Sequence, residues 1–441
     1  MVANVLEKRT EEPRIRIQSN KVLCYSPYNL WALHGMWEMT ILQALRLRGA
    51  HVHYVVCDGL YSDCDVHWEA TNPRDAMSCI ECQASVANLA NSMKMPFFWL
   101  GRYLLPDDFQ EARQWAESLA TDDFLTATYQ DWHIGEWVES SVHSHLRISE
   151  LDFSHPKIKD AYRSYLYSGL IASLGIDRLL DGYKPDVLFL FNGRQSSTRV
   201  AFELARRRGI RVICHERGNL KESLKITENI SCISLQSVEQ AWQLWKDIPL
   251  VPTELEKIVE YMHGRQFGKN LNWRSFSPEP QDTNSVRRNL GLDPSRPLFV
   301  LFSSSDDELI AHKEWQGPFP KQMEWIKKTI NFVEGHPEMD LIIRVHPNIA
   351  GKKATGNNVQ QLREFESLGN HLPRNVRLVM PDDPISSYSL MDLAHLGLVY
   401  MSTVGLEMAC KGKNVIVAGG GWLYDQPFVQ TVHSWNGQDS R

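Results

Sequence analysis

The stretch PLFVLFSS (297–304) opens a region in which short apolar runs alternate with helical patterns as far as residue 421. The later runs are DLIIRVHP (340–347), VRLVMP (376–381), LGLVYMS (396–402) and NVIVAGGG (414–421). Their near-continuous apolar character is typical of strands that are buried on both faces of a sheet. The segments between them have helical spacing, near 320–334, 357–367, 385–393 and 403–411. Strict alternation of strands and helices predicts a doubly wound parallel sheet.

The same scheme is present earlier in the chain. KVLCYSPYN (21–29) and HVHYVVCDG (51–59) flank a helical stretch at 35–48 that ends at Gly49. The alternation resumes with a helix near 157–180, PDVLFLFNG (185–193), a helix at 196–208 and RVICHERG (211–218). Residues 60–155 are less regular and are interpreted as a mostly helical insertion. The sequence therefore predicts a second Rossmann-like sheet.

Two such sheets in series predict an α/β protein with two Rossmann-like doubly wound domains that face a cleft. A length of 441 residues agrees with more than one hydrophobic core. Residues 266–285 are rich in Gly, Asn, Ser and Pro and lack apolar periodicity, so we interpret them as a linker. The predicted domains are then 1–265, with its insertion at about 60–155, and 286–441.

The composition excludes several classes of protein. A net charge of −6 offers no basic field for a phosphate backbone, so nucleic acid is not an expected partner. No run reaches 18 apolar residues, and the first twenty residues are polar and lack the apolar centre of a signal peptide. The sequence predicts a cytoplasmic protein, with peripheral contact to the inner face of the plasma membrane left open.

Four of the eight cysteines are clustered, namely Cys57, Cys64, Cys79 and Cys82. A Cys-x-x-Cys pair forms half of many zinc sites, but the spacing of the other two residues is loose. Reduced structural thiols are the default interpretation, and zinc at these four residues is the alternative.

Ligands of open α/β sheets bind beyond the carboxyl ends of the strands, so polar residues at those ends are the first candidates for a site. Arg344 and His346 end one apolar strand at alternate positions, and Pro347 prevents its continuation. A guanidinium and an imidazole on the same side of a strand end are suited to hold a phosphate. The alternative is an Arg paired with a surface acid and a His that caps a helix.

A second candidate follows the strand LGLVYMS. Ser402 and Thr403 are good N-cap residues, Gly405 permits close backbone approach, and first-turn amides favour an anion. Glu407 lies one turn into the helix, where its carboxylate could accept hydrogen bonds from ribose or sugar hydroxyls. Its alternative role is interaction with the helix dipole. Ser386 and Ser387 begin another helix, where they either cap it or contact the nucleotide.

In this order, R-x-H-P, SS before a helix, S-T-x-G-x-E and a Gly-rich strand end resemble the donor half of GT-B glycosyltransferases of the bacterial capsule polysaccharide biosynthesis group, which includes the Kdo transferases. The resemblance covers roughly residues 297–425. It implies that the HP and Ser-rich motifs surround the phosphate and ribose of a donor nucleotide, often a CMP-activated one. Before residue 285 the resemblance is only architectural.

The N-terminal half should then carry the acceptor and the catalytic group. Its candidates for acid–base catalysis are His34 and Glu38, just beyond the first predicted strand, and His215 and Glu216, which end the strand RVICHERG. Asn192, Arg194 and Arg217 are the candidates for contact with the acceptor or a phosphate. Each has an ordinary alternative as a capping residue or a member of an ion pair.

The resulting hypothesis is a glycosyltransferase that moves a sugar from a nucleotide-activated donor to a surface polysaccharide or a lipid-linked acceptor. No Asp-x-Asp motif stands where a metal-dependent GT-A enzyme needs it, so no cofactor is required and the leaving group is left to Arg344, His346 and helix amides. A nucleotide-sugar epimerase or hydrolase remains an alternative, since HERG is similar to the pattern of UDP-sugar 2-epimerases. A non-catalytic subunit of polysaccharide assembly or export is the third hypothesis.

Overall fold

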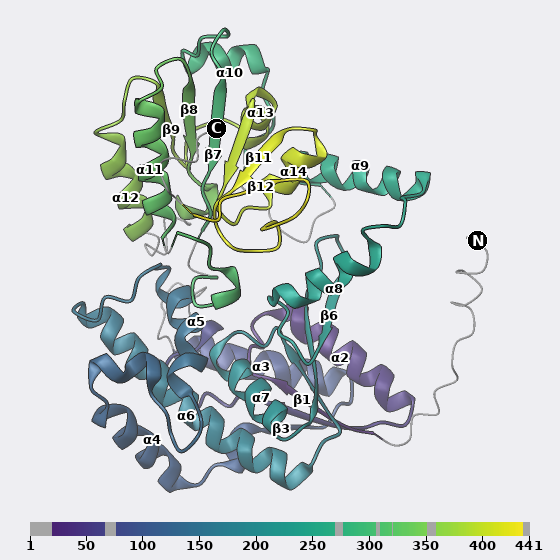
Figure 1. The fold of residues 1–441 in the computed structure, drawn as a ribbon. Coiled ribbons are helices and arrows are strands. Elements are labelled where there is room, and N and C mark those ends of the chain that lie inside the picture. The colour runs from purple at the N-terminus through teal and green to yellow at the C-terminus, as the bar shows by residue number, and fades with distance from the viewer. Residues whose placement is uncertain are drawn as a thin grey trace.

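The computed structural model describes residues 20–66, 76–269, 277–305, 309–319, 321–350 and 359–434. The chain forms two lobes, one built around strands β1 to β6 and the other around strands β7 to β12 (Figure 1). Each lobe is a six-stranded sheet with helices packed on it. This confirms the predicted α/β architecture of two Rossmann-like halves in a GT-B-like arrangement.

The N-terminal sheet has the strand order β3-β2-β1-β4-β5-β6. All neighbouring strands are parallel except β5 and β6, which are antiparallel. The strands are β1 (Lys21–Ser26), β2 (His51–Val56), β3 (Phe97–Trp99), β4 (Val187–Phe191), β5 (Arg211–Arg217) and β6 (Leu224–Glu228). The predicted helical insertion therefore contains one strand of the sheet, β3, which is too short to show a period of two.

Alternate side chains of the central strand enter two different cores. Leu23 and Tyr25 of β1 belong to a core on one face of the sheet, whereas Val22 and Cys24 belong to a core on the other face. A strand that is buried on both faces needs apolar residues at every position, which explains the unbroken run VLCY.

Helices cover both faces of the N-terminal sheet. The smaller core contains buried side chains of α2 (Ala32–Leu47) and α3 (Ala76–Ser92). The larger core contains buried side chains of α5 (Ile134–Leu146), α6 (Pro156–Tyr183) and α7 (Ser196–Arg207). Helix α4 (Pro106–Ser118) and two 3₁₀ turns, η2 (Leu100–Tyr103) and η3 (Thr121–Thr126), complete this lobe.

The C-terminal sheet is parallel throughout, with the order β12-β11-β10-β7-β8-β9. Its strands are β7 (Leu298–Phe302), β8 (Asp340–Arg344), β9 (Val376–Val379), β10 (Leu396–Val399), β11 (Asn414–Val417) and β12 (Gln430–Thr431). Again alternate residues enter separate cores: Val300 lies on one side of the sheet and Leu301 on the other.

Helix α11 of this lobe packs through one face. In α11 the buried residues recur at helical spacing, from Gln322 through Trp325 and Ile326 to Val333. The helices are α10 (Thr283–Asn289), α11 (Gln322–Glu334), α12 (Val359–Gly369), α13 (Ser387–Leu393) and α14 (Val404–Cys410), with 3₁₀ turns η4 (Lys313–Trp315) and η5 (Pro347–Ala350).

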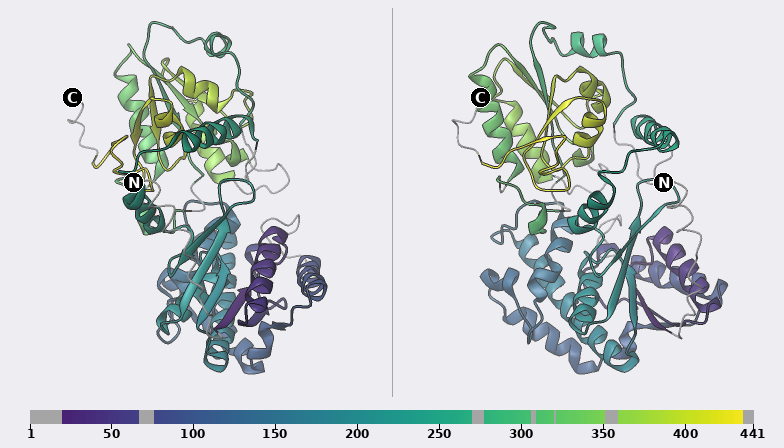
Figure 2. Two further views of the ribbon diagram at one scale, coloured as in Figure 1. Left: turned by 90° about the vertical axis from the view of Figure 1, so that its right-hand side faces the viewer. Right: turned by 45° about the vertical axis from the view of Figure 1, so that its right-hand side comes forward.

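After the last strand of the first sheet the chain forms α8 (Leu235–Trp245) and α9 (Pro252–Phe267), which precede α10 and the first strand of the second sheet (Figures 1 and 2). Part of the predicted linker, residues 270–276, lies outside the described residues. The domain limits at 265 and 286 therefore stay a prediction.

The two lobes contact each other through the segment that follows β7. Trp315 donates from its indole Nε1 to the carbonyl oxygen of Ile233 at 3.0 Å. The carboxylate of Glu314 accepts from the backbone N–H of Leu235, at the start of α8, at 3.0 Å. At the rim, the Lys321 ammonium lies 2.7 Å from the Glu150 carboxylate. The carboxyl-end loops of the two sheets thus approach each other.

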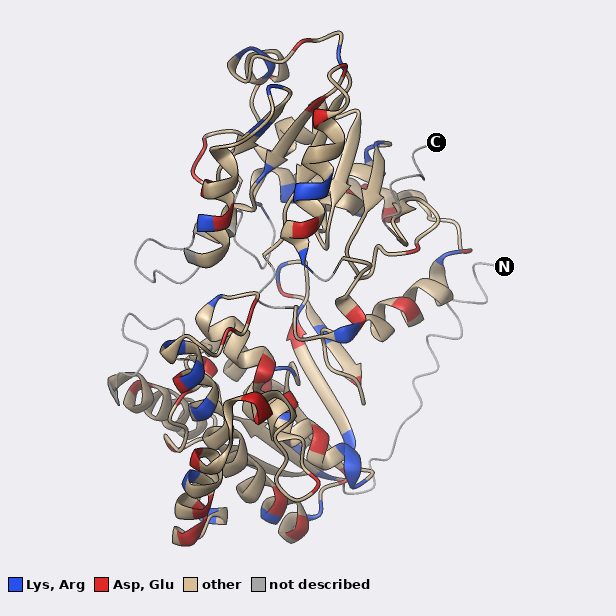
Figure 3. Cartoon of the chain, turned by 60° about the vertical axis from the view of Figure 1, so that its left-hand side comes forward, with Lys and Arg blue, Asp and Glu red and all other residues tan. Residues whose placement is uncertain are grey.

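Within the part of the chain that the structure describes, no helix is long and apolar enough to cross a membrane. Basic and acidic residues are interspersed along the ribbon of both lobes in Figure 3. This distribution agrees with the modest net charge of −6.

A glycine on α6 allows close packing between helices, which yields a stability prediction. A Cβ built on Gly169 would lie 2.7 Å from Cγ1 of Val138 and 3.1 Å from Cγ2 of Ile134, both on α5. We expect Gly169→Ala to lower the free energy of unfolding by about 1 to 3 kcal/mol, because α5 and α6 must separate. Thermal melting or urea denaturation followed by circular dichroism measures this.

Gly182 supplies the control on the same helix, because a Cβ there has no neighbour within 4 Å. Gly182→Ala should leave the protein as stable or raise its stability by up to about 1 kcal/mol, through the better helix propensity of alanine. Equal effects of the two substitutions would contradict the packing argument.

Candidate functional site

Both sheets have the strand order of a Rossmann fold, and this order fixes where ligands can bind. In each sheet, successive strands are added first towards one edge and then towards the other. The change occurs between β1 and β4 in the first lobe and between β7 and β10 in the second. Loops at such a switch point diverge and leave a crevice beyond the carboxyl ends of the strands. The residues predicted from the sequence follow these strands or their immediate neighbours.

In the N-terminal lobe, His215 and Glu38 form a fully buried pair. Nε2 of His215, on β5, lies 2.8 Å from Oε1 of Glu38, on α2, and both side chains are at most 1% exposed. Nδ1 of His215 and Oε2 of Glu38 have no hydrogen-bond partner among the described residues.

His34 and Glu216 form a second pair beside the first. Nε2 of His34 lies 3.6 Å from Oε1 of Glu216. Burial lowers the pKa of His34 to about 3, with further contributions from the charges of His215 and Arg217, so the imidazole is neutral at pH 7. Burial also raises the pKa of Glu216, and the hydrogen bonds that its carboxylate accepts oppose this shift only in part. A neutral imidazole next to a carboxyl group of raised pKa is suited to acid–base chemistry.

A left-handed turn after β4 positions the Glu216 carboxylate. Asn192 has φ +55° and Gly193 has φ +79°, and Asn192 donates from its side-chain amide to Oε2 of Glu216 at 2.7 Å. The backbone N–H of Arg217 donates to Oε1 at 2.8 Å. Asparagine tolerates this conformation better than other non-glycine residues, so the turn and the carboxylate depend on one side chain.

Arg194 is buried within its own lobe. Its Nη1 donates to the hydroxyl oxygens of Ser140 at 2.9 Å and Ser144 at 2.8 Å, both on α5. The three residues predicted to contact the acceptor substrate or a phosphate thus have different contacts. Asn192 and Arg217 hold Glu216, whereas Arg194 anchors the turn to α5.

In the C-terminal lobe, Arg344 at the end of β8 is 1% exposed. Its Nε donates to the hydroxyl of Ser387 at 3.3 Å, and its Nη1 donates to the carbonyl oxygen of Met380. Its Nη2 is buried and has no hydrogen-bond partner among the described residues. Burial lowers the pKa of Arg344 to about 10, partly opposed by the charge of Asp383. A buried guanidinium with an open donor is what an anion site requires.

His346 and Pro347 lie at the carboxyl edge beside the end of β7. The backbone N–H of His346 donates to the Ser303 hydroxyl at 2.8 Å, and Pro347 begins the 3₁₀ turn η5. Side chains of α11 and α12 hold the next residue, Ser304. Gln322 of α11 accepts from the backbone N–H of Ser304 at 2.6 Å, and Gln361 of α12 donates to its carbonyl oxygen at 3.0 Å.

The serines and the glycine of the predicted donor motifs have mostly structural contacts. Ser386 is the N-cap of α13 and accepts from the N–H of Tyr388 at 3.2 Å, and Ser402 accepts from the N–H of Val404 at 3.3 Å. A Cβ on Gly405 would lie 2.8 Å from Cδ1 of Leu423, so glycine is needed there for packing. Ser387, in contrast, touches Arg344 directly.

Glu407 and Thr403 are bound by Arg265 of α9. The guanidinium donates to Oε1 of Glu407 at 2.6 and 3.0 Å and to the hydroxyl of Thr403 at 3.2 Å. Glu407 is 3% exposed, and its Oε2 has no hydrogen-bond partner among the described residues. Burial and the nearby Glu407 carboxylate raise the pKa of Tyr388. Glu407 is therefore a buried carboxylate that is already paired with Arg265 and lies next to Tyr388.

The structure brings these residues together within each lobe, and His312 connects the lobes. Burial lowers the pKa of His312, in the segment after β7, to about 3, with contributions from the charges of Arg194 and Arg199 of the other lobe. The turn after β4 and the segment after β7 are therefore neighbours. In this region Gly420 and Gly421 pack against Trp315 and Gly419 packs against Tyr400, which gives these glycines a packing role.

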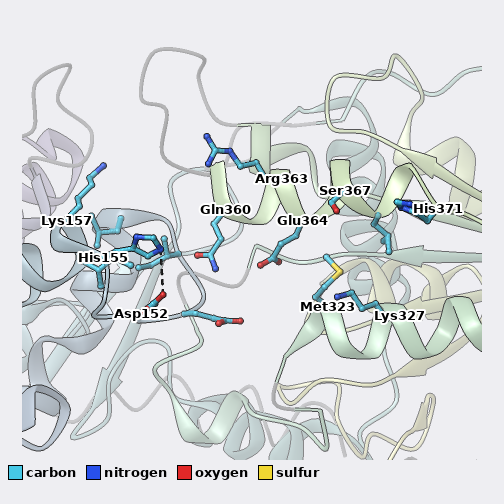
Figure 4. Close-up of a pocket in the computed structure, with 15 residues that line it drawn as sticks. Asp152, His155, Lys157, Met323, Lys327, Gln360, Arg363, Glu364, Ser367 and His371 are labelled. Atoms are coloured by element: carbon cyan, nitrogen blue, oxygen red, sulfur yellow. Dashed lines mark ion pairs between the residues drawn. The ribbon is translucent and has the colours of Figure 1, made fainter. Parts of the chain in front are cut away.

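A cavity of about 910 Å³ lies between the lobes, on the side of α11 and α12 (Figure 4). In Figure 4, Asp152, His155 and Lys157 line it from the N-terminal lobe, and Gln360 and Glu364 from α12 face them. Its lining carries acidic, basic, amide and aliphatic side chains. Sequence reasoning assigned none of these residues to a site.

The four clustered cysteines line one small cavity, but they are free thiols. Burial raises the pKa of Cys57 to about 12 and raises the pKa of Cys64, Cys79 and Cys82 as well. Protonated thiols are poor metal ligands. Among the described residues, no group of three or more His, Cys, Asp or Glu side chains is arranged to hold a metal ion.

Sequence reasoning missed Arg265, His312, Ser303 and Ser304. The serine run SSS (303–305) at the end of β7 could have been found, because it lies at the switch point of a predicted sheet. Arg265 and His312 have no comparable signal, since their partners lie far away in the sequence.

No protein-family model and no curated protein matches the sequence. Among solved structures, the chain is similar to KpsC of Thermosulfurimonas dismutans, a β-Kdo 2,4 transferase, with a TM-score of 0.37 and 15% identity over 55% of this chain and 72% of that one. It is also similar to the UDP-GlcNAc 2-epimerases of Methanocaldococcus jannaschii and Neisseria meningitidis. For the first the TM-score is 0.29, at 12% identity over 93% of this chain and 88% of that one. For the second it is 0.22, at 12% identity over 90% and 82%.

The depressed pKa of His34 predicts a specific pH dependence of stability. The pKa is 6.5 for an ordinary histidine and about 3 in the folded protein, so between these values the unfolded state binds the proton and the folded state does not. Stability is therefore lost as the pH falls below about 6.5. We expect the melting temperature of His34→Asn to fall less than that of the wild type when the pH is lowered from about 7.5 to about 5.

The exposed His51, at the start of β2, provides the matched control. His51→Asn should keep the wild-type dependence of melting temperature on pH. If the curves for His34→Asn and the wild type run parallel, His34 is not buried as a neutral imidazole.

The Arg265–Glu407 pair predicts strong coupling between α9 and the C-terminal lobe. We expect a double-mutant cycle with Arg265→Ala and Glu407→Ala to give a coupling of about 1 to 3 kcal/mol in urea unfolding, because the carboxylate is buried and each single variant strands its partner. The exposed Arg211–Glu228 pair, with 55% and 51% side-chain exposure, is the control and should give about 0 to 1 kcal/mol. Similar couplings for the two pairs would contradict this.

Proposed function

We propose that this protein is a glycosyltransferase that moves a sugar from a nucleotide-activated donor, with CMP among the candidate nucleotides, to a surface polysaccharide or a lipid-linked acceptor. The donor phosphate would bind at the carboxyl edge of the C-terminal sheet, and the acceptor hydroxyl at that of the N-terminal sheet. No metal ion is part of the proposed mechanism.

The open Nη2 of Arg344 is the observation that carries the proposal. A guanidinium that is 1% exposed and has no carboxylate within hydrogen-bond distance among the described residues is costly unless an anion binds it. Its position at the end of β8 lies one strand from the switch point between β7 and β10. A phosphate there would accept from Arg344, with Ser387 beside it and His346 at the same edge.

The N-terminal lobe supplies a candidate for the general base. Glu216 has a raised pKa and is held by Asn192 and by the N–H of Arg217, with the neutral His34 at 3.6 Å. In the proposed step, Glu216 or His34 accepts the proton of the acceptor hydroxyl as its oxygen attacks the anomeric carbon. The bond from that carbon to the donor phosphate breaks, and Arg344 stabilises the charge that develops on the phosphate.

The cavity between the lobes offers a route for the rest of the acceptor. Its lining combines acids, bases and aliphatic side chains, which suits a ligand with many hydroxyl groups better than a polyanion. Met323 and Gln360 of this lining are adjacent in sequence to Gln322 and Gln361, which hold Ser304 at the end of β7. We propose that a glycan chain extends along this side.

An epimerase or hydrolase is the second candidate function. The buried His215–Glu38 pair next to Glu216 places two acid–base groups on one strand end, as removal and return of a proton would need. Incubation with donor alone separates the alternatives. An epimerase or hydrolase converts the donor without an acceptor, and a transferase needs one.

Donor binding tests the proposal directly. We expect CMP, UDP or GDP, or one of their sugars, to raise the melting temperature of the wild type, because a ligand that binds only the folded state stabilises it. Arg344→Gln should lose this shift, since it removes the guanidinium. Differential scanning fluorimetry across the panel measures both.

Arg374 provides the control for the charge change, because it is exposed and precedes β9 at the opposite edge of the sheet. Arg374→Gln should keep the wild-type shift. Because Arg344→Gln could lower stability itself, Ser387→Ala is the second variant and should weaken the shift. Absence of any shift in the wild type, or a full shift in both site variants, would sink the proposed donor site.

A further inference from the structure

Asp65, in the segment after β2, is a buried carboxylate to which the proposed reaction gives no role. The residue is 1% exposed. It accepts from the hydroxyls of Tyr28 at 2.9 Å, Ser141 at 2.5 Å and Ser196 at 3.2 Å. The three donors belong to the segment after β1, to α5 and to the start of α7. Asp65 therefore joins three separate elements at the carboxyl edge of the N-terminal sheet.

Both oxygens of this carboxylate are bound. Oδ1 accepts from Ser141, and Oδ2 accepts from Tyr28 and Ser196. Because Ser141 donates its hydroxyl hydrogen to Asp65, its oxygen can accept from the backbone N–H of Ser196, at 2.7 Å. Burying a carboxylate is costly unless such hydrogen bonds compensate it, and a completely bonded buried network holds its members in one arrangement.

One route leads from this network to Glu216. Ser196 is the first residue of α7 and follows the left-handed turn that begins at Asn192. Its hydroxyl is bound to Asp65 and its backbone N–H to Ser141. At the other end of the turn, Asn192 donates to Oε2 of Glu216 at 2.7 Å. The network thus anchors the turn that holds the Glu216 carboxylate.

A second route leads to His34 through aromatic rings. The hydroxyl of Tyr28 donates to Asp65. The Tyr28 ring lies 5.0 Å from the ring of Trp31 and 6.5 Å from the ring of Phe191, measured between centroids. The imidazole of His34 lies 4.2 Å from the Phe191 ring and 6.5 Å from the Trp31 ring. We call these three rings the aromatic wall of His34.

We propose that Asp65 is a positioning residue for the candidate acid–base pair, because one side chain fixes both the turn that holds Glu216 and the aromatic wall of His34. Two groups that act on one substrate proton must be held in place before the substrate arrives, and residues behind them supply this support. The catalytic importance of this role rests on the proposed function, whereas the positioning itself does not.

NMR spectra of the full chain with isotope-labelled histidine test the aromatic wall. Ring currents of Phe191 and Trp31 shift the Cε1–Hε1 signal of His34, and the absence of this signal from His34→Asn identifies it. We expect Asp65→Asn to move the signal at constant pH. The amide has the shape of the carboxylate, but it can no longer accept from all three hydroxyls.

Hydrogen exchange followed by mass spectrometry tests the turn. Asp65→Asn should speed exchange within residues 192–199 and at Arg217 at least about 10-fold, because the network that supports these N–H groups is broken. If Asp65→Asn does not fold, two variants that each remove one hydroxyl replace it. Tyr28→Phe should then move the His34 signal, and Ser196→Ala should speed exchange in the turn.

Asp108 provides the matched control, because it is another carboxylate of this lobe and is 3% exposed. It accepts from Nη2 of Arg178 at 2.7 Å and from the backbone N–H of Leu105 at 2.6 Å, at the start of α4. Asp108→Asn should lower the melting temperature, but it should leave the His34 signal and exchange at residues 192–199 as in the wild type.

If Asp65→Asn lowers the melting temperature like Asp108→Asn and leaves both readouts unchanged, the network is only structural and the proposal is overturned. A response in only one readout overturns it too, since the two routes would then not share Asp65. Tyr28→Phe and Ser196→Ala are judged together in the same way. The donor is proposed to bind the other lobe, so a wild type without a nucleotide-induced shift of melting temperature counts against the proposed function and not against this role of Asp65.

Discussion

The direction of the parallel strands is the constraint on which the candidate site depends. In a parallel sheet every strand ends at the same edge, so residues far apart in the sequence are collected there. His34, Asn192 and His215 are brought together in this way, as are Ser303, Arg344 and Ser402 in the other sheet. The segment after β7 then joins the two edges through Trp315 and His312.

Burial of charge at these edges has three different outcomes. His215 and Glu38 satisfy each other in a hydrogen bond, and His34 avoids charge through its depressed pKa. Arg344 does neither, because its pKa of about 10 keeps it charged at pH 7 and one of its donors stays open. Among the described residues, Arg344 has neither a hydrogen-bonded carboxylate nor a neutral form at pH 7, which makes it the first candidate for contact with an anionic ligand.

The sequence predicted the strands well where they are long and buried. The runs VLCY, LFVLF and DLIIR become β1, β7 and β8, because a strand with two buried faces requires an unbroken apolar run. It did not predict β3, which has three residues, or β6, whose sequence LKITE alternates weakly. Local patterns hold too little information for such short pairings.

The limits at the site have a similar cause. Glu407 was predicted as a ligand of sugar or ribose hydroxyls, and the structure adds a partner, Arg265, that lies 142 positions earlier. Conversely, Arg344 was predicted from its place at a strand end, which is a local feature. Sequence patterns identify residues that face a strand edge, but tertiary packing decides which of them are already paired.

The rim contact between Lys321 and Glu150 bears on how firmly the two lobes are held together. The two side chains are 59% and 40% exposed, and an ion pair in such surroundings contributes only about 0 to 1 kcal/mol. Parting the lobes at this side therefore needs little energy compared with the binding of a charged substrate. Such an arrangement would let a ligand that binds between the lobes govern how far they separate on this side.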